Sequence, residues 1–91
     1  MKLSLLSAAD VQRSLSDWLR LQRKARKLSR QALAERSTVP AATIKKFETT
    51  GQISLRQFLL LWQTLDDLKR VHELTVEPKS TPASIDEVLR S

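Results

Sequence analysis

Several residue types that build chemical sites are scarce in this chain of 91 residues. It has no cysteine and no tyrosine, a single histidine, His72, and a single glycine, Gly51. It can therefore form no disulfide framework, no ordinary His/Cys zinc site and no glycine-rich loop that cradles phosphates. A histidine-based catalytic triad could use only His72, and nothing near that residue resembles a nucleophile elbow. We therefore expect a protein that is not an enzyme and that uses no cofactor or metal.

Long apolar runs are also lacking. The longest candidates, residues 3–6 and 58–62, fall far short of the ~20 residues that span a bilayer. The first residues include Lys2 and a few leucines but no signal-peptide pattern, so we expect a cytoplasmic location. The apolar fraction of 41% is ordinary for a globular protein, and the length suggests one domain.

The formal net charge of +6 is unevenly distributed along the chain. Residues 13–46 carry ten cations and two acids, a net charge of +8. Residues 47–91 carry five cations and seven acids, a net charge of −2. Such an asymmetry suggests two surfaces with different partners. The basic segment suits nucleic acid or an anionic membrane, and a merely solvated charged face is the alternative.

The first part of the chain has the spacing of an amphipathic helix that begins after Ser7 and ends near Lys27. Ser7 can cap this helix, and Asp10 completes a variant of the capping box. Asp10 also suits the positive end of the helix dipole, and the cations near Lys27 suit the negative end. The face predicted to lie in the core consists of Val11, Leu15, Trp18, Leu19, Gln22 and Ala25.

Two short helices are predicted next, and their arrangement has the pattern of a helix-turn-helix. Ser29 can cap a helix over residues 30–36, a turn follows at residues 37–39, and Pro40 opens a helix that ends near residue 48. This geometry leaves the N-terminal, outward face of the second helix free to enter a major groove. The small side chain of Ala34 lets the two helices cross closely. The space beneath this crossing is expected to be filled by Leu33, Val39, Ile44 and Phe47.

The remaining part of the chain is expected to add further helices. Gly51 lies in a loop where it is free to take positive φ. A shorter helix from residue 66 to about residue 74 is followed by a polar linker over residues 75–81 and a last short helix over residues 85–90. Between Gly51 and this shorter helix, a helix over residues 55–65 is expected. Its core-facing residues are Leu55, Phe58, Leu59, Trp62 and Leu65.

The sequence resembles the XRE or Cro-like family of phage-repressor helix-turn-helix proteins. Residues 28–48 read L-S-R-Q-A-L-A-E-R-S-T-V-P-A-A-T-I-K-K-F-E and follow that family's pattern, and the resemblance covers residues 15–65. The pieces A-T-I-x-x-F-E and L-x-x-F-x-x-x-x-Q-x-L, at residues 42–48 and 55–65, look most like HipB-type antitoxins. Those are small dimeric repressors encoded beside a HipA-type kinase toxin.

Together with the predicted helices, the resemblance indicates an all-α fold, a five-helix phage-repressor-like helix-turn-helix domain over residues 1–75. A linker and short C-terminal segment, able to form a helix, would occupy residues 76–91. Carried over position by position, the DNA-facing residues are Arg30, Gln31, Ala41, Ala42, Thr43, Lys45 and Lys46. Supporting electrostatics at the end of the first helix is expected from Arg23, Lys24, Arg26 and Lys27.

Two departures from the family pattern affect this expected site. Thr38 stands where the family usually has glycine, so the turn either avoids positive φ or stores about 1–3 kcal/mol of strain. Ala41 and Ala42 stand where related proteins often carry glutamine or arginine, so these positions can make only apolar contacts, such as with a thymine methyl.

The expected function is that of a sequence-specific transcriptional repressor that binds a palindromic operator as a homodimer. The resemblance further implies an autoregulating antitoxin of a HipBA-type toxin-antitoxin operon, with a HipA-type kinase toxin as its protein partner. A stand-alone phage-type repressor without a toxin partner and a protein-binding adaptor are the alternatives. The fourth or fifth helix is expected to supply the dimer contact.

Overall fold

The computed structural model of the protein describes residues 5–77, and all regular secondary structure in that range is helical. The first helix, α1, spans Ala8–Ala25 and begins at the predicted cap. The Ser7 hydroxyl accepts a hydrogen bond of 3.1 Å from the backbone N–H of Asp10, and the Asp10 carboxylate accepts one of 3.0 Å from the backbone N–H of Ser7. This capping box satisfies donors that the helix end would leave unpaired.

α1 ends in a turn that reverses the chain around a residue of positive φ. Lys27 has a φ of 56° and occupies the position where glycine is usual. The Leu28 N–H donates to the Arg23 carbonyl at 3.1 Å, and the Lys27 N–H donates to the Lys24 carbonyl at 2.9 Å. These two bonds form a Schellman motif, which satisfies the last carbonyls of α1 and directs buried Leu28 into the core.

Two short helices follow, close to their predicted limits. α2 spans Arg30–Ser37, and the Ser29 hydroxyl caps its first turn as expected. α3 spans Ala41–Thr50 and begins after Pro40. It ends at Gly51, which has a φ of 78°, so the predicted positive φ of this residue is confirmed.

The chain continues into α4, which spans Leu55–Leu65, and α5, which spans Leu68–His72. Extended backbone at Asp66 separates the two helices, and one turn of 3-10 helix over Glu73–Thr75 continues α5. The predicted helix over residues 85–90 lies outside the described residues.

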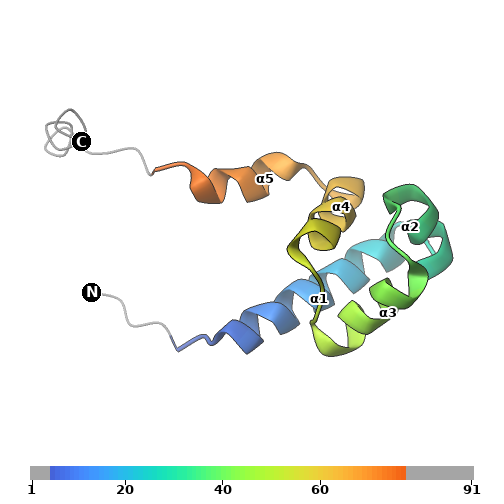
Figure 1. Ribbon diagram of the computed structural model, residues 1–91, viewed down its shortest axis with the longest axis horizontal. Helices are drawn as coiled ribbons and strands as arrows, with labels where there is room; N and C mark the ends of the chain where they lie inside the picture. Colours follow the sequence, from blue (N-terminus) through green and yellow to red (C-terminus); the bar gives the residue numbers. More distant parts are fainter. Residues whose placement is uncertain (1–4, 78–91) are drawn as a thin grey trace, which may run out of the picture.

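The core lies where α1 to α4 meet. α1 packs against α3 and α4, α2 packs against the same two helices, and α5 packs against α4 (Figure 1). Full burial of one large apolar side chain stabilises a fold by about 1.5–3 kcal/mol. The buried apolar residues are Leu19, Leu28, Leu33, Val39, Ile44, Phe47, Leu61, Trp62 and Leu65.

A row of aromatic rings connects α1, α3 and α4. Trp18 stacks on Trp62, with ring centroids 4.4 Å apart and planes 20° apart. The Phe58 ring lies 5.7 Å from Phe47 and 5.8 Å from Trp62. The Trp62 indole N–H also donates to the Asp67 carbonyl at 2.9 Å, which ties the start of α5 to α4. Both tryptophans therefore serve packing, as the sequence predicts.

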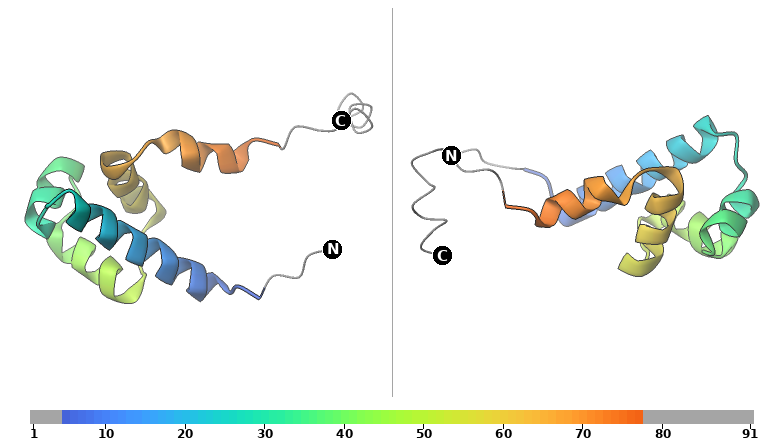
Figure 2. Two further views of the ribbon diagram at one scale, coloured as in Figure 1. Left: turned by 180° about the vertical axis from the view of Figure 1, so that it is seen from behind. Right: turned by 90° about the horizontal axis from the view of Figure 1, so that it is seen from above.

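Three residues predicted to lie in the core are exposed instead. Val11 and Leu55 are 43% and 72% exposed, and Ala25 is exposed at the last turn of α1. The first turns of α1 extend past the other helices, in the same direction as α5, so Val11 has little to pack against (Figure 2). Leu55 is the first residue of α4.

No helix within residues 5–77 combines the length and the apolar character needed to cross a bilayer.

Candidate nucleic-acid interface

The connection between α2 and α3 is short and tightly hydrogen-bonded. Thr38 has a φ of 65°, and its N–H donates to the Ala34 carbonyl at 2.9 Å, which ends α2. The buried Ser37 hydroxyl accepts a 3.2 Å bond from the N–H of Val39, itself 1% exposed. Of the two expectations for Thr38, the structure shows the strained one, in which a β-branched residue takes positive φ.

A buried ion-pair network holds α1, α2 and α3 together. Glu48 on α3 is 8% exposed and Arg23 on α1 is 7% exposed. The Arg23 guanidinium donates to the two carboxylate oxygens of Glu48 at 2.7 and 3.0 Å and to the Leu28 carbonyl at 2.8 Å. Arg30 on α2 adds a third bond to Glu48 at 3.0 Å. The two arginines and one carboxylate therefore fix how the start of α2 sits against α3.

This network corrects part of the expected electrostatic support at the end of α1. Arg23 is held by Glu48 and is not available to a ligand. Arg26 donates to the Gln22 side chain at 2.8 Å and also to the Leu65 carbonyl, so it too is used within the fold. Lys24 and Lys27 are exposed, and their side chains make no hydrogen bond or ion pair within residues 5–77. Of the four expected supporting cations, Arg23 is buried, Arg26 is exposed but bonded, and Lys24 and Lys27 are exposed and unengaged within residues 5–77.

The predicted DNA-facing residues lie on α2 and α3 and differ in exposure. Arg30 is only partly accessible, because 34% of its side chain is exposed and it is bonded to Glu48. Ala41 and Thr43 are half-buried in the first turns of α3. The exposed members of the predicted set are Gln31, Ala42, Lys45 and Lys46.

Four exposed residues of α3 share one face. Ala42, Lys45, Lys46 and Thr49 are spaced at i, i+3, i+4 and i+7, which places them on a single side of the helix. The opposite side carries buried Ile44 and Phe47. The side chains of Lys45 and Lys46 make no hydrogen bond or ion pair in the described part of the chain. Two uncompensated cations therefore project from the outward face of α3.

A shallow hollow lies between α2 and α3, beside this face. Gln31 and Ala41 from the predicted set contribute to it, together with exposed Glu35, the one acid in its lining. It is largely open to solvent. Its full lining is Gln31, Ala34, Glu35, Thr38, Val39, Pro40 and Ala41.

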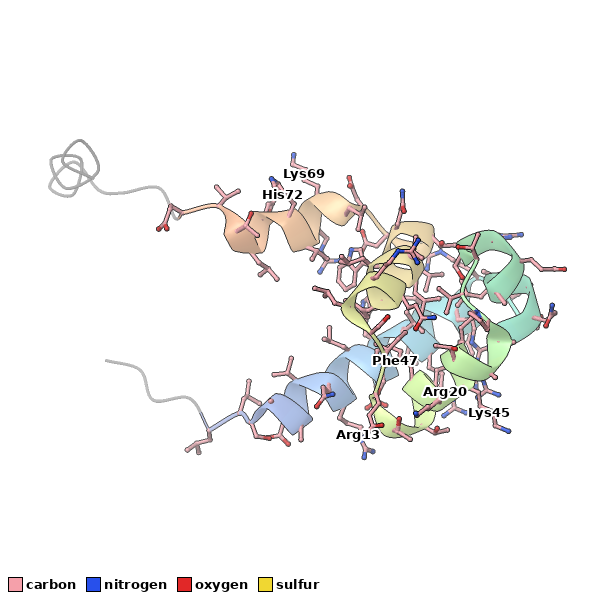
Figure 3. The ribbon with its side chains drawn as sticks, in the orientation of Figure 1. Arg13, Arg20, Lys45, Phe47, Lys69 and His72 are labelled. Atoms are coloured by element: carbon pink, nitrogen blue, oxygen red, sulfur yellow. The ribbon has the colours of Figure 1, made fainter. Side chains whose placement is uncertain are left out.

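Groups suited to metal or acid–base chemistry do not gather at this surface. Residues 5–77 contain no cluster of three or more His, Cys, Asp or Glu side chains that could hold a metal. Two carboxyl groups have a lowered pKa, and both lie elsewhere. The backbone N–H of Ser7 lowers the pKa of Asp10, and that of Asp67 lowers the pKa of Asp66. His72 is exposed on α5 (Figure 3). The surface offers charge and shape for binding.

Sequence reasoning assigned no role to Glu48, which organises the interface from within. The sequence does contain a signal for this role. Glu48 is an isolated acid in a strongly basic region, and a carboxylate that becomes buried there needs a cation as its partner. Which of the nearby arginines it would take required the fold.

Comparisons with protein-family models, with curated proteins and with solved structures find no match to this chain.

Proposed function

We propose that this protein is a sequence-specific DNA-binding transcriptional repressor in which α3 enters the major groove. The observation that carries the proposal is the outward face of α3, formed by Ala42, Lys45, Lys46 and Thr49. This face is exposed, one-sided and positively charged, and the helix is held from behind by buried contacts. A helix that presents a short polar face from a rigid base is what major-groove reading requires.

Each member of the predicted set has a role in this proposal. Lys45 and Lys46 lie one turn beyond the start of α3, and one of them reaches a base edge while the other reaches a phosphate. Thr43 has a hydroxyl that can donate or accept at either target. Ala42, with Ala41 beside it, makes apolar contact with a thymine methyl. At the start of α2, Gln31 and the free part of the Arg30 guanidinium face the backbone.

A dimer on a palindromic operator is part of the same proposal, because one short helix reads only a few base pairs. Exposed apolar side chains that a second copy could cover lie near both ends of the described residues. Leu5 is 89% exposed, and Leu74 and Val76, which follow α5, are 84% and 57% exposed. The segment after α5 is therefore one candidate for the dimer contact, and α4, whose first residue Leu55 is 72% exposed, is the other.

A second candidate role, as an antitoxin, uses this same apolar segment after α5. Its exposed Leu74 and Val76 lie beside the acids Glu73 and Glu77, in the acidic half of the chain. A protein partner with a basic rim would complement such a surface. The resemblance to HipB-type antitoxins suggests that this partner is a HipA-type kinase toxin. A stand-alone repressor would bind the operator DNA without that toxin partner. A protein-binding adaptor would bind a protein without the operator DNA.

The experiment that tests the proposal measures binding to the duplex upstream of the protein's own gene and to a scrambled duplex, at two salt concentrations. We expect tighter binding to the upstream duplex, weakening as salt increases. Thr43→Ala or Lys46→Ala should reduce the preference, since one good base contact discriminates by about 1–3 kcal/mol.

A matched control is Arg36→Ala, which removes an exposed cation that makes no side-chain hydrogen bond within residues 5–77. It should leave the preference unchanged. Equal binding to both duplexes, or no binding to either, would contradict the proposal and direct attention to a protein partner of the acidic half.

A further inference from the structure

α1 and α3 meet along an edge that two side-chain contacts define. The Gln12 amide of α1 donates to the Gly51 carbonyl at 3.2 Å, and Arg23 pairs with Glu48 at 2.7 Å. Residues three positions apart on a helix are neighbours on its surface. Arg20 precedes Arg23 by three positions, and Lys45 precedes Glu48 by three, so both lie beside this edge.

A band of cations therefore runs along the outer side of the α1–α3 contact. We define the basic band as Arg13, Arg20, Lys24 and Lys45. All four are exposed, and none of their side chains forms a hydrogen bond or ion pair with another described residue. Arg13, Arg20 and Lys45 project on the same side of the molecule, away from Lys69 and His72 (Figure 3). Asp17 offsets one of these charges.

The length of the band fits an extended polyanion better than a small anion. Arg13 and Lys24 are eleven positions apart, which at 1.5 Å per residue is about 16 Å along α1. Double-stranded DNA carries one negative charge per about 1.7 Å of its axis, so such a length faces several phosphates. A compact anion could touch only one end of the band.

The apolar side of α1 does not favour a membrane surface as the partner. A basic amphipathic helix binds a bilayer through a free apolar face. In α1 that face carries Leu19, which is fully buried, and Trp18, which stacks on Trp62. Beside the basic band α1 exposes one large apolar side chain, Leu21, which is 66% exposed and too little to form an apolar face of that kind. The adjoining outward face of α3 is the proposed DNA surface.

We propose that Arg13, Arg20 and Lys24 bind phosphates of the DNA backbone beside the groove that α3 enters, so that α1 lengthens the contact beyond the base pairs that α3 reads. This inference rests on the proposed function, since α3 must first place the DNA. The contacts are independent of base sequence, because a guanidinium or ammonium group on a phosphate carries no base information.

The test uses the whole protein and the double variant Arg13→Gln/Arg20→Gln, with the upstream and scrambled duplexes as probes. Each phosphate contact contributes about 0.9 to the slope of log affinity against log salt, so the variant should lose about 1.8 for each bound protomer. The ratio of the wild-type affinity to the affinity of this variant should then fall by about 12-fold per protomer as salt increases from about 50 to 200 mM.

The matched control is Arg36→Gln/Lys69→Gln, which removes the same charge from exposed positions on α2 and α5. We expect its salt slope to stay within about 0.5 of the wild-type slope, since Arg36 and Lys69 are not proposed to contact any phosphate.

The possible outcomes separate the two proposals. If the wild type prefers the upstream duplex and both double variants behave alike, the basic band is not a DNA contact although the repressor proposal stands. If the band variant alone loses slope on both duplexes and neither duplex is preferred, the band binds DNA and sequence-specific repression is wrong. If the wild type binds neither duplex, both proposals fail.

Discussion

Two sides of the α1–α3 contact, an inner edge around buried Glu48 and an outer face that carries Lys45 and Lys46, use cationic residues in opposite ways. On the inner edge, Arg23 and Arg30 converge on Glu48 and are removed, wholly or in part, from solvent. On the outer face, Lys45 and Lys46 have no partner within residues 5–77. The position of one carboxylate decides which cations stabilise the fold and which are available to a ligand. A count of charges along the chain does not reveal this difference.

The largest effect is expected at the inner edge, from Glu48→Gln. The substitution keeps the shape of the side chain but leaves the Arg23 charge, 7% exposed, without its counter-charge. Breaking a buried ion pair from one side destabilises a protein by about 3–5 kcal/mol. For a domain of this size we expect a Tm lower by at least about 12 °C, measured by thermal unfolding.

Two further variants make this prediction specific. Glu35→Gln removes an exposed acid from α2 and should change the free energy of unfolding by no more than about 0.5 kcal/mol. The double variant Arg23→Met/Glu48→Leu removes both buried charges and should be more stable than Glu48→Gln alone. If Glu48→Gln were as stable as Glu35→Gln, the inner edge would be no more structural than the outer face.

A smaller effect of opposite sign is expected at the turn between α2 and α3. Thr38→Gly relieves a φ of 65° that costs a non-glycine residue about 1–3 kcal/mol. The greater freedom of glycine in the unfolded chain offsets about 0.5–1 kcal/mol of this gain. We expect a net stabilisation of about 1 kcal/mol in chemical denaturation, with the salt slope of DNA binding unchanged because no cation moves.

Gly51→Ala is the converse variant at the end of α3. Gly51 has a φ of 78°, and an added Cβ would lie 3.3 Å from the Cβ of Gln12 on α1. The substitution adds strain where Thr38→Gly removes it, so we expect a loss of about 1–2 kcal/mol. If both variants shifted stability in the same direction, positive φ would not be the cause.

Much of the fold could be predicted from the sequence, because the signals involved are local. The caps at Ser7 and Ser29 and the break at Gly51 act within a few residues of where they stand. The core positions Leu33, Val39, Ile44 and Phe47 follow from spacing within short helices. Val11 and Leu55 were predicted wrongly, because helical spacing shows which face is apolar but not how far the neighbouring helix extends.

The site was predicted less completely, because availability depends on contacts between distant residues. Lys45, Lys46 and Ala42 are exposed on one face as expected, whereas Arg30 and Arg23 are engaged by Glu48, 18 and 25 positions away. No periodicity within one helix reports such a pairing. The basic band also depends on which side of α1 meets α3, which only the packing of the two helices decides.

The smallest effect is expected from an exposed carboxylate with a partner, Asp10 at the start of α1. The backbone N–H and then the hydroxyl of Ser7 lower the pKa of Asp10 below its ordinary value of 3.8 in the folded state. A carboxyl group with a lowered pKa in the folded state contributes stability above its unfolded pKa and loses it as the pH falls through the folded pKa. Asp10→Asn should therefore be less stable than the wild type at neutral pH, and the difference should vanish as the pH drops well below 3.8. Amide exchange in the first turn of α1 would locate the loss, because fraying there leaves the inner edge intact. A difference between the two proteins that stayed constant as the pH fell through this range would show that the Asp10 charge does not stabilise the helix start, and that shape alone makes the cap.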